Sequence, residues 1–297
     1  MRVAITGASG LIGTALSRHL KGTGHDVVPV VRRQPTANEI GWSVTEGRID
    51  EDAFAGIDAV VHLAGAGIGD RRWTDDYKKL LVESRTAGTG LVAEAVRSAS
   101  TPPSVVLSGS AMGYYGESLT ETFDETSPNG SGFLADLCVE WEAAAQPVRS
   151  EHTRLALLRT GLVLSAEGGA LKKQLPLFKL GLGGRMGHGR QWQSWISIDD
   201  MVGAITHLLT APVDGPVNLT APNPVTNAEF TDTLGEVLGR PTFLPIPTFG
   251  PKLLLGAELA ENLLFAGQKV VPTVLQQTGY EFAHTDLASA LRAVLDN

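Results

Sequence analysis

Three glycines near the start of the chain restrict its fold more than any other feature. They are Gly7, Gly10 and Gly13. A short apolar run, Val3–Thr6, precedes them, and a segment with helical apolar spacing, Leu11–Lys21, follows. In such a pattern the first glycine permits a sharp turn off a strand, the second lets phosphates approach the backbone, and the third lets the helix pack closely. The spacing therefore predicts a strand, a tight turn and a helix whose first N–H groups favour an anion.

The same alternation of strand and helix patterns continues along the first 110 residues. Short runs rich in Val and Ile are separated by segments with the 3.6-residue spacing of helices. Continuous apolar runs of this length suit parallel strands that are buried on both faces. We expect strands at Val3–Thr6, Asp26–Val31, Ala59–Leu63 and Ser104–Ser108, and a long helix at Asp75–Ser98. This order predicts an α/β fold with a Rossmann-type, doubly wound parallel sheet.

The second half of the chain has a less regular pattern. A helix is expected from about Phe133 to Gln146 and a strand at Leu155–Arg159. Prolines then become frequent, and their turns separate short elements rather than forming a linker. We expect a nucleotide-binding domain in residues 1–165, with a return segment at about 190–220. The remainder, mainly residues 166–297, is expected to form a smaller C-terminal substrate lobe.

Two segments of this second half have patterns of their own. Leu253–Phe265 is apolar but interrupted by Glu258, Glu261 and Asn262, which predicts an amphipathic helix packed on the core. Gly187–Trp192 is flexible, aromatic and basic. Such a stretch either closes over a polar ligand or packs its tryptophan against the core, and the sequence leaves both readings open.

Composition narrows the choice of partners. The formal net charge of −8 repels a phosphate backbone over most of the surface, so no nucleic-acid partner is expected. The only cysteine, Cys138, permits no internal disulfide, and the seven histidines are scattered, so no metal site is expected. The start of the chain runs directly into a strand, and no apolar stretch reaches 18 residues. We therefore expect a soluble, cytoplasmic protein with no membrane partner.

The end of the second expected strand carries two basic residues in Val31-Arg32-Arg33. Sites for NAD usually have an acidic residue there, which binds the ribose 2′-hydroxyl and would repel a 2′-phosphate. Arginine instead offers a permanently charged, planar set of donors that matches a phosphate. The pattern favours NADP(H) over NAD(H), and the alternative is a pair of solvated arginines on a loop. Small residues in Leu63-Ala64-Gly65 would let the cofactor cross the sheet edge.

Motifs along nearly the whole chain resemble one superfamily. The first three are Thr6–Gly13, His62–Gly65 and Ser108–Gly116. They are similar to the extended short-chain dehydrogenases/reductases, the superfamily of nucleotide-sugar epimerases and dehydratases. Further segments resemble an atypical subgroup, the epimerase family proteins of unknown function: Trp73 with Glu83-Ser84-Arg85, Phe133-Leu134 with Trp141-Glu142, Arg159–Leu164, Gly187–Asp200, Gly215–Thr226 and Gly267–Pro272.

This resemblance implies a set of cofactor contacts. The positions that match the family's NADP contacts are Gly7, Ser9, Gly10, Leu11, Ile12, Gly13, Arg32, Leu63, Ala64 and Arg85. The expected set also includes Val31, Arg33, Gly65, Ser108, Arg159 and Leu162. Arg85 lies on the expected long helix, from which its guanidinium reaches toward the cofactor phosphates. The alternative for Arg85 is a surface side chain paired with an acid such as Glu83.

The resemblance also implies a catalytic pattern that this chain lacks. The superfamily uses a serine to orient the substrate and a tyrosine, followed by a lysine four residues on, as general acid/base. Ser110 matches the serine, but Leu134 and Cys138 stand at the tyrosine and lysine positions. None of the four tyrosines has a lysine four residues further on. Tyr115 is the nearest substitute, and without a neighbouring cation its pKa should stay near ~10, which makes it a poor base at neutral pH.

Two functions therefore remain open beside a third interpretation, a structural protein with a vestigial glycine loop. One is an NADP(H)-dependent epimerase- or oxidoreductase-like enzyme that acts on an unidentified small polar substrate with non-standard proton transfer, with Ser110 and Tyr115 as catalytic candidates. The other is a non-catalytic NADP(H)-binding protein that senses redox state or regulates a partner. The resemblance implies both monomers and dimers, so an oligomer is left open.

Overall fold

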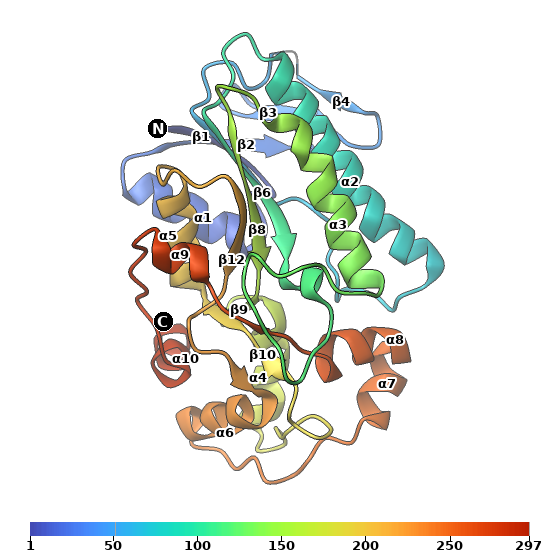
Figure 1. Cartoon of the computed structure of the whole chain (residues 1–297). Helices are drawn as coiled ribbons and strands as arrows, with labels where there is room; N and C mark the ends of the chain where they lie inside the picture. The colour runs from blue at the N-terminus through green and yellow to red at the C-terminus, as the bar shows by residue number, and fades with distance from the viewer. Residues whose placement is uncertain (51, 297) are drawn as a thin grey trace.

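Eight strands form one twisted sheet in the computed structural model, which describes residues 1–50 and 52–296 (Figure 1). Their order across the sheet is β12-β8-β6-β5-β1-β2-β3-β4. All neighbours pair parallel except β3 and β4. The strands are β1 (Arg2–Thr6), β2 (Asp26–Val31), β3 (Ile40–Ser43), β4 (Arg48–Ile49), β5 (Ala59–His62), β6 (Val105–Ala111), β8 (Arg154–Thr160) and β12 (Gly215–Leu219). The predicted Rossmann-type parallel sheet is confirmed.

Helices cover both faces of this sheet. On one face α1 (Leu11–Gly22) and α5 (Ile198–Leu208) bury the side chains of alternate strand residues, such as Val3 and Ile5. On the other face α2 (Asp75–Ser98) and α3 (Phe133–Ala145) cover the strand residues whose side chains point the opposite way, including Ala4. Burial on both sides explains why the strands are continuous apolar runs. Two short 3₁₀ turns, η1 (Met112–Tyr115) and η2 (Gln146–Val148), flank α3.

Most of the rest of the chain forms a smaller lobe around its own apolar cluster, at the end of the molecule away from β1 and β2 (Figure 1). The short helix α9 (Thr273–Gln277) instead buries Leu275 against the large sheet, beside β12. Trp195, Phe230 and Leu291 are among its buried side chains. Three two-stranded ladders, β9–β11, β10–β13 and β7–β14, join its segments. The remaining elements are β7 (Thr122–Phe123), β9 (Leu162–Leu164), α4 (Gly169–Lys179), β10 (Trp192–Gln193), β11 (Trp195–Ser197), β13 (Val225–Thr226), α6 (Asn227–Leu238), α7 (Phe249–Leu255), α8 (Ala257–Ala260), η3 (Glu261–Phe265), β14 (Lys269–Val270), α9 (Thr273–Gln277) and α10 (Leu287–Leu295).

The amphipathic core helix expected at Leu253–Phe265 is wrong. The segment is broken at Gly256, whose φ of +93° separates α7 from α8. No residue of α7 is buried, and Leu253 is 77% exposed. The sequence pattern misled because it recorded apolar residues but not the left-handed glycine that turns them away from the core.

Candidate functional site

The glycine turn between β1 and α1 leaves no space for side chains. A Cβ on Gly13 would lie 2.2 Å from the carbonyl oxygen of Gly7. Gly7 itself has a φ of +66°, and a Cβ there would lie 3.0 Å from the backbone of Leu63 and Ala64. The turn therefore brings the ends of β1 and β5 into backbone contact, which only glycine permits.

The amino-terminal end of α1 offers unpaired backbone donors. Its cap residue is Gly10, no side chain caps it, and its first turn has no acidic residue. The first N–H groups of a helix have no partner within the helix, and the helix dipole makes them favourable for an anion. This end of α1 therefore fits a phosphate group.

Of the two arginines that follow β2, one is paired with an acidic side chain and the other is not. Arg33 donates to both oxygens of Glu39, over 2.8 and 2.5 Å, and this pairing lowers the pKa of Glu39 to about 2. Glu39 also accepts from the backbone N–H of Thr36, so its carboxylate links two residues of the segment that follows β2, Arg33 and Thr36. Arg32 is exposed and forms no side-chain hydrogen bond or ion pair within residues 1–50 and 52–296. Of the pair, Arg32 is the one free to bind a phosphate.

A buried relay supports the turn that follows β5. The hydroxyl of Thr6 accepts from the backbone N–H groups of Leu63 and Ala64, over 3.0 and 3.2 Å. Its own proton then points at Nδ1 of His62, 2.7 Å away, which leaves the ring proton on Nε2 to donate to Thr89. Trp141 donates to the same Thr89 hydroxyl. Burial lowers the pKa of His62 to about 4, so the relay is built on a neutral ring.

Arg85 is buried beneath this turn rather than exposed on the surface. Its guanidinium donates to the carbonyl oxygens of Ala66 and Leu81 and stacks 4.9 Å from the ring of Trp141. It is only 9% exposed, and Glu83 pairs instead with Lys79. The alternative of a surface Arg85–Glu83 pair is therefore wrong. Arg85 holds the turn in place, and its contact with a cofactor stays a prediction.

Ser110 and Tyr115 belong to one buried hydrogen-bonded cluster at the end of β6. The register of β6 and β8 places Ser110 beside Arg159. Ser110 donates to Glu142 over 2.7 Å, and Glu142 accepts two further bonds from Arg159, over 2.8 and 2.9 Å. Arg159 also donates to the Tyr115 oxygen over 3.0 Å, and Tyr115 donates to Asn218 over 2.7 Å. Every one of these side chains is buried.

The chemistry of this cluster differs from the sequence-based expectation. Tyr115 does have a cationic neighbour, Arg159, but burial outweighs that charge and raises its pKa to about 12. Burial alone would lower the pKa of Arg159, but hydrogen bonding and charge from Glu142 raise it. Burial raises the pKa of the Cys138 thiol to about 12. The cluster is thus a closed arrangement that holds its protons tightly.

The other predicted cofactor residues lie at the edge where the parallel strands end. Val31 closes β2, Leu162 opens β9 beside β11, and Ser108 lies in β6 opposite His62. Ser108 is buried, and its hydroxyl has no partner among the described residues. Ser9, Leu11 and Ile12 form the glycine turn and the start of α1. Gly65 faces the Arg85 side chain, and a Cβ at this position would lie 3.5 Å from it.

Sequence reasoning missed the residues that connect these parts. Glu142, Asn218, Thr6 and His62 were assigned no role, although each is a polar side chain within an apolar run. That contrast was the available signal, because polar groups are buried only when hydrogen-bonded. Their partners were not readable, since Tyr115 and Asn218 lie 103 positions apart.

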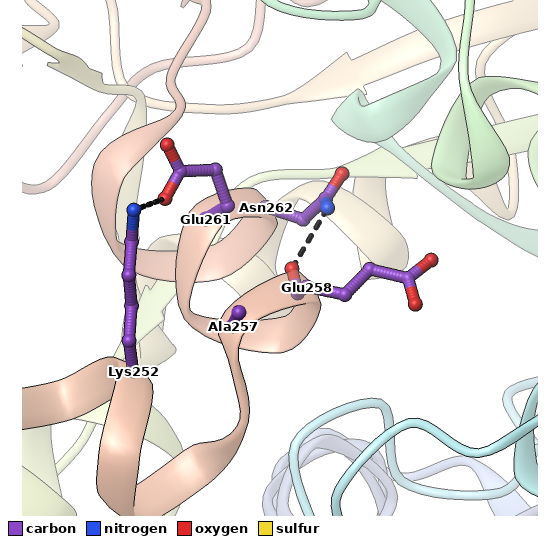
Figure 2. A pocket seen from close by; sticks show the side chains of 5 residues that line it. All are labelled: Lys252, Ala257, Glu258, Glu261 and Asn262. Carbon is purple, nitrogen blue, oxygen red and sulfur yellow. Dashed lines mark hydrogen bonds and ion pairs between the residues drawn. The ribbon is translucent and has the colours of Figure 1, made fainter. Parts of the chain in front are cut away.

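A hollow between α7 and α8 has a different character. It is lined by Lys252, Ala257, Glu258, Glu261 and Asn262 (Figure 2). Lys252 pairs with Glu261 over 2.7 Å, and Asn262 donates to the carbonyl oxygen of Glu258 (Figure 2). Glu258 in turn pairs with Lys78 of α2. Because its charged groups are paired with their neighbours, the hollow is a weak candidate for a ligand site.

Within residues 1–50 and 52–296, no group of three His, Cys, Asp or Glu side chains lies close enough to hold a metal ion. Within the same residues, no helix combines the length and apolarity that a bilayer span requires.

The sheet order, the glycine turn and the free end of α1 define a Rossmann-type protein of the extended short-chain dehydrogenase/reductase class. The chain belongs to the NAD dependent epimerase/dehydratase family, whose model matches residues 3–220. Residues 246–294 match a second model, a domain of unknown function.

Similar proteins occur in bacteria and animals. An epimerase family protein of Mycobacterium tuberculosis is 43% identical over 97% of this chain and 96% of its own length. Human epimerase family protein SDR39U1 is 40% identical over 99% of this chain and all of its own. A crystal structure of its isoform 2 with NADPH has a TM-score of 0.92, and each chain covers the other completely. A nucleoside-diphosphate sugar epimerase from Corynebacterium glutamicum has a TM-score of 0.80 at 35% identity, with 99% of this chain and 58% of that chain covered.

Proposed function

We propose that this chain binds NADP(H) and is an epimerase- or oxidoreductase-like enzyme of the atypical extended short-chain dehydrogenase/reductase type, with a small polar molecule as substrate. One observation carries the proposal: the end of α1 has free donors while Arg32, after the neighbouring β2, has no partner within the described residues. A dinucleotide with a 2′-phosphate satisfies both. The human relative crystallised with NADPH, which matches over the whole chain, supports it. The single cysteine, which permits no internal disulfide, fits a reducing compartment such as the cytoplasm.

The residues present fit such a cofactor. The glycine turn and the first N–H groups of α1, from Leu11 to Gly13, would hold the pyrophosphate, and Arg32 would hold the 2′-phosphate. The turn Leu63–Gly65, supported by Thr6 and Arg85, would carry the cofactor across the sheet edge. NADP(H), when bound, supplies or accepts a hydride.

Proton transfer is the step that this chain handles differently from its superfamily. Leu134 cannot exchange a proton, and the Cys138 thiol is buried with a raised pKa. Ser110 and Tyr115 remain the candidates, but Ser110 already donates to Glu142, and Tyr115 would have to leave Asn218. For a carbonyl reduction we therefore propose that the substrate or a water molecule supplies the proton while the cofactor supplies the hydride.

The test is a titration followed by a turnover assay. Purified protein is titrated with NADPH and NADH by nicotinamide fluorescence, and saturable binding with preference for NADPH is expected. NADPH oxidation is then followed with a panel of aldehydes, ketones and keto-sugars, and oxidation must match the carbonyl consumed. Absence of saturable binding of either nucleotide at physiological salt would overturn the proposal.

A second function is favoured by the closed state of the buried cluster. The polar groups of this cluster are paired with one another, in hydrogen bonds that join Ser110, Glu142, Arg159 and Tyr115. Such pairing is expected of a cluster that stabilises the fold and takes no part in a reaction. A non-catalytic NADP(H) sensor or regulator needs no reactive group, so this cluster is compatible with it. Tight NADPH binding with no turnover across the panel would favour this function over the enzyme.

A further inference from the structure

The large apolar side chains that are exposed in this protein are unevenly distributed. Among the described residues, eight of the eleven such side chains lie in two short segments, 177–182 and 243–254. They are Leu177, Leu180, Leu182, Phe243, Leu244, Phe249, Leu253 and Leu254. Phe243 is 79% and Phe249 71% exposed. Large apolar side chains that are exposed together, rather than singly, mark a site of interaction.

The backbone brings these two segments together. The backbone N–H of Ile246 donates to Arg185, and that of Gly187 donates to Ile246. Gly181 and Pro241 also approach each other, with a Cβ on Gly181 placed 3.6 Å from the proline ring. Figure 1 shows the segment between α6 and α7 running along the end of the molecule farthest from β1 and β2. We call residues 172–190 together with 240–254 the apolar–basic surface.

The charges of this surface are opposite to those of the whole chain. Residues 172–190 and 240–254 contain seven Lys and Arg side chains and no Asp or Glu, whereas the protein as a whole has a net charge of −8. Five of the seven are Lys172, Lys173, Lys179, Arg185 and Arg190, all exposed. Lys252 pairs with Glu261 (Figure 2), and Lys173 pairs with Asp70. Among the described residues, Lys179, Arg185 and Arg190 are exposed and have no ion-pair partner. Exposed apolar groups are thus set among cations in an otherwise acidic molecule.

We propose that the apolar–basic surface docks on an anionic lipid surface, with Phe249, Leu253 and Leu254 of α7 entering the headgroup region. Apolar side chains surrounded by Lys and Arg are the features by which a protein binds a bilayer interface without spanning it. A second copy of the chain fits less well, because a two-fold contact through this surface would bring its unpaired cations, Lys179, Arg185 and Arg190, toward their own copies. The absence of a membrane partner expected from the sequence rested on spanning length, which does not address surface binding.

The experiment is co-sedimentation of the full chain with vesicles. Vesicles of pure phosphatidylcholine are compared with vesicles that contain phosphatidylserine, at low and at physiological salt. Binding is expected only to the anionic vesicles, and it should weaken with salt. The variant Phe249→Ser with Leu253→Ser and Leu254→Ser should lose that binding. Lys179→Glu with Arg185→Glu should weaken it roughly fivefold or more per charge changed.

Matched controls separate this surface from general effects. Leu80→Ser with Val139→Ser removes exposed apolar groups elsewhere, and Lys21→Glu with Arg97→Glu reverses charges elsewhere. Both controls should bind vesicles as the natural chain does, and all variants should bind NADPH equally if they are folded. No binding to anionic vesicles, equal loss in variants and controls, or a dimer in light scattering that the α7 variant abolishes would each overturn the proposal.

Discussion

Two regions at the carboxyl edge of the central sheet, the glycine turn after β1 and the cluster at the end of β6, differ in how their polar groups are paired. At the glycine turn, the N–H groups of α1 and the guanidinium of Arg32 are left without partners in the described structure. At the end of β6, Ser110, Glu142, Arg159, Tyr115 and Asn218 are all paired with one another. Unpaired donors at a surface are available for a ligand, whereas paired donors in the interior resist change.

This difference suggests that binding and catalysis have separated in this chain. The first region has the features of a nucleotide site, and the second has those of a buried structural ion pair. Variants that disturb one region and spare the other test that separation directly.

The largest effect is expected from Glu142→Gln. It leaves the buried guanidinium of Arg159 without a countercharge, and removing one partner of a buried pair costs about 3–5 kcal/mol of unfolding free energy. Urea denaturation measures the loss. NADPH affinity of the folded protein should change little, because Glu142 pairs within the β6 cluster.

Two controls define this result. Glu83→Gln removes an exposed carboxylate from the ion pair with Lys79 and should barely change stability. Glu142→Leu combined with Arg159→Met removes both charges and should recover part of the loss. If Glu142→Gln unfolds no more easily than Glu83→Gln, the cluster is not the structural ion pair described here.

The next effect is on cofactor affinity. Arg32→Glu should weaken NADPH binding roughly 100-fold, because a charge-assisted bond is lost and a repulsion is added. NADH binding should be nearly unchanged. Fluorescence titration with both nucleotides measures the ratio.

Arg33→Ala is the matched comparison, since Arg33 is already held by Glu39. Its effect on NADPH should be much smaller. Equal losses of NADPH and NADH in Arg32→Glu would mean that Arg32 does not bind the 2′-phosphate.

The fold was predictable where structure depends on local pattern. The strand at Asp26–Val31 and the helix at Asp75–Ser98 have the bounds that apolar spacing indicates. The smaller lobe was not predictable in the same way, because its ladders are two or three residues long and give no periodic signal. Gly256 shows the same limit, since its left-handed conformation is set by the surrounding fold.

In the candidate site, too, the residues that act within one local motif were predictable, whereas those placed by tertiary packing were not. Gly7, Gly10 and Gly13 act within one turn, so their spacing alone indicated their role. Arg85 was expected to reach the cofactor or the surface, and only tertiary packing shows it buried against Trp141. The cationic neighbour of Tyr115 was invisible for the same reason, since Arg159 lies 44 positions further along the chain.

A pH-dependent effect is expected from the relay under the cofactor turn. His62 has a pKa of about 4 when folded and ~6.5 when unfolded, so the unfolded chain binds a proton that the native ring does not. Its stability contribution is complete above about pH 6.5 and is lost as the pH falls toward 4. From pH 7 to pH 5 the loss should be roughly 2 kcal/mol. His62→Gln should lower this slope in urea denaturation, and an unchanged slope would contradict a neutral, buried His62.

The smallest effect is expected from Tyr115→Phe, and it bears most directly on the catalytic question. Loss of the hydroxyl leaves Asn218 without one hydrogen bond and should lower unfolding free energy by about 1–2 kcal/mol. NADPH affinity should stay the same, because the phenol is enclosed between Arg159 and Asn218. If a carbonyl substrate is found, turnover of this variant should stay close to that of the natural chain. A fall of ~100-fold or more would instead assign proton transfer to Tyr115 and join the two regions into one active site.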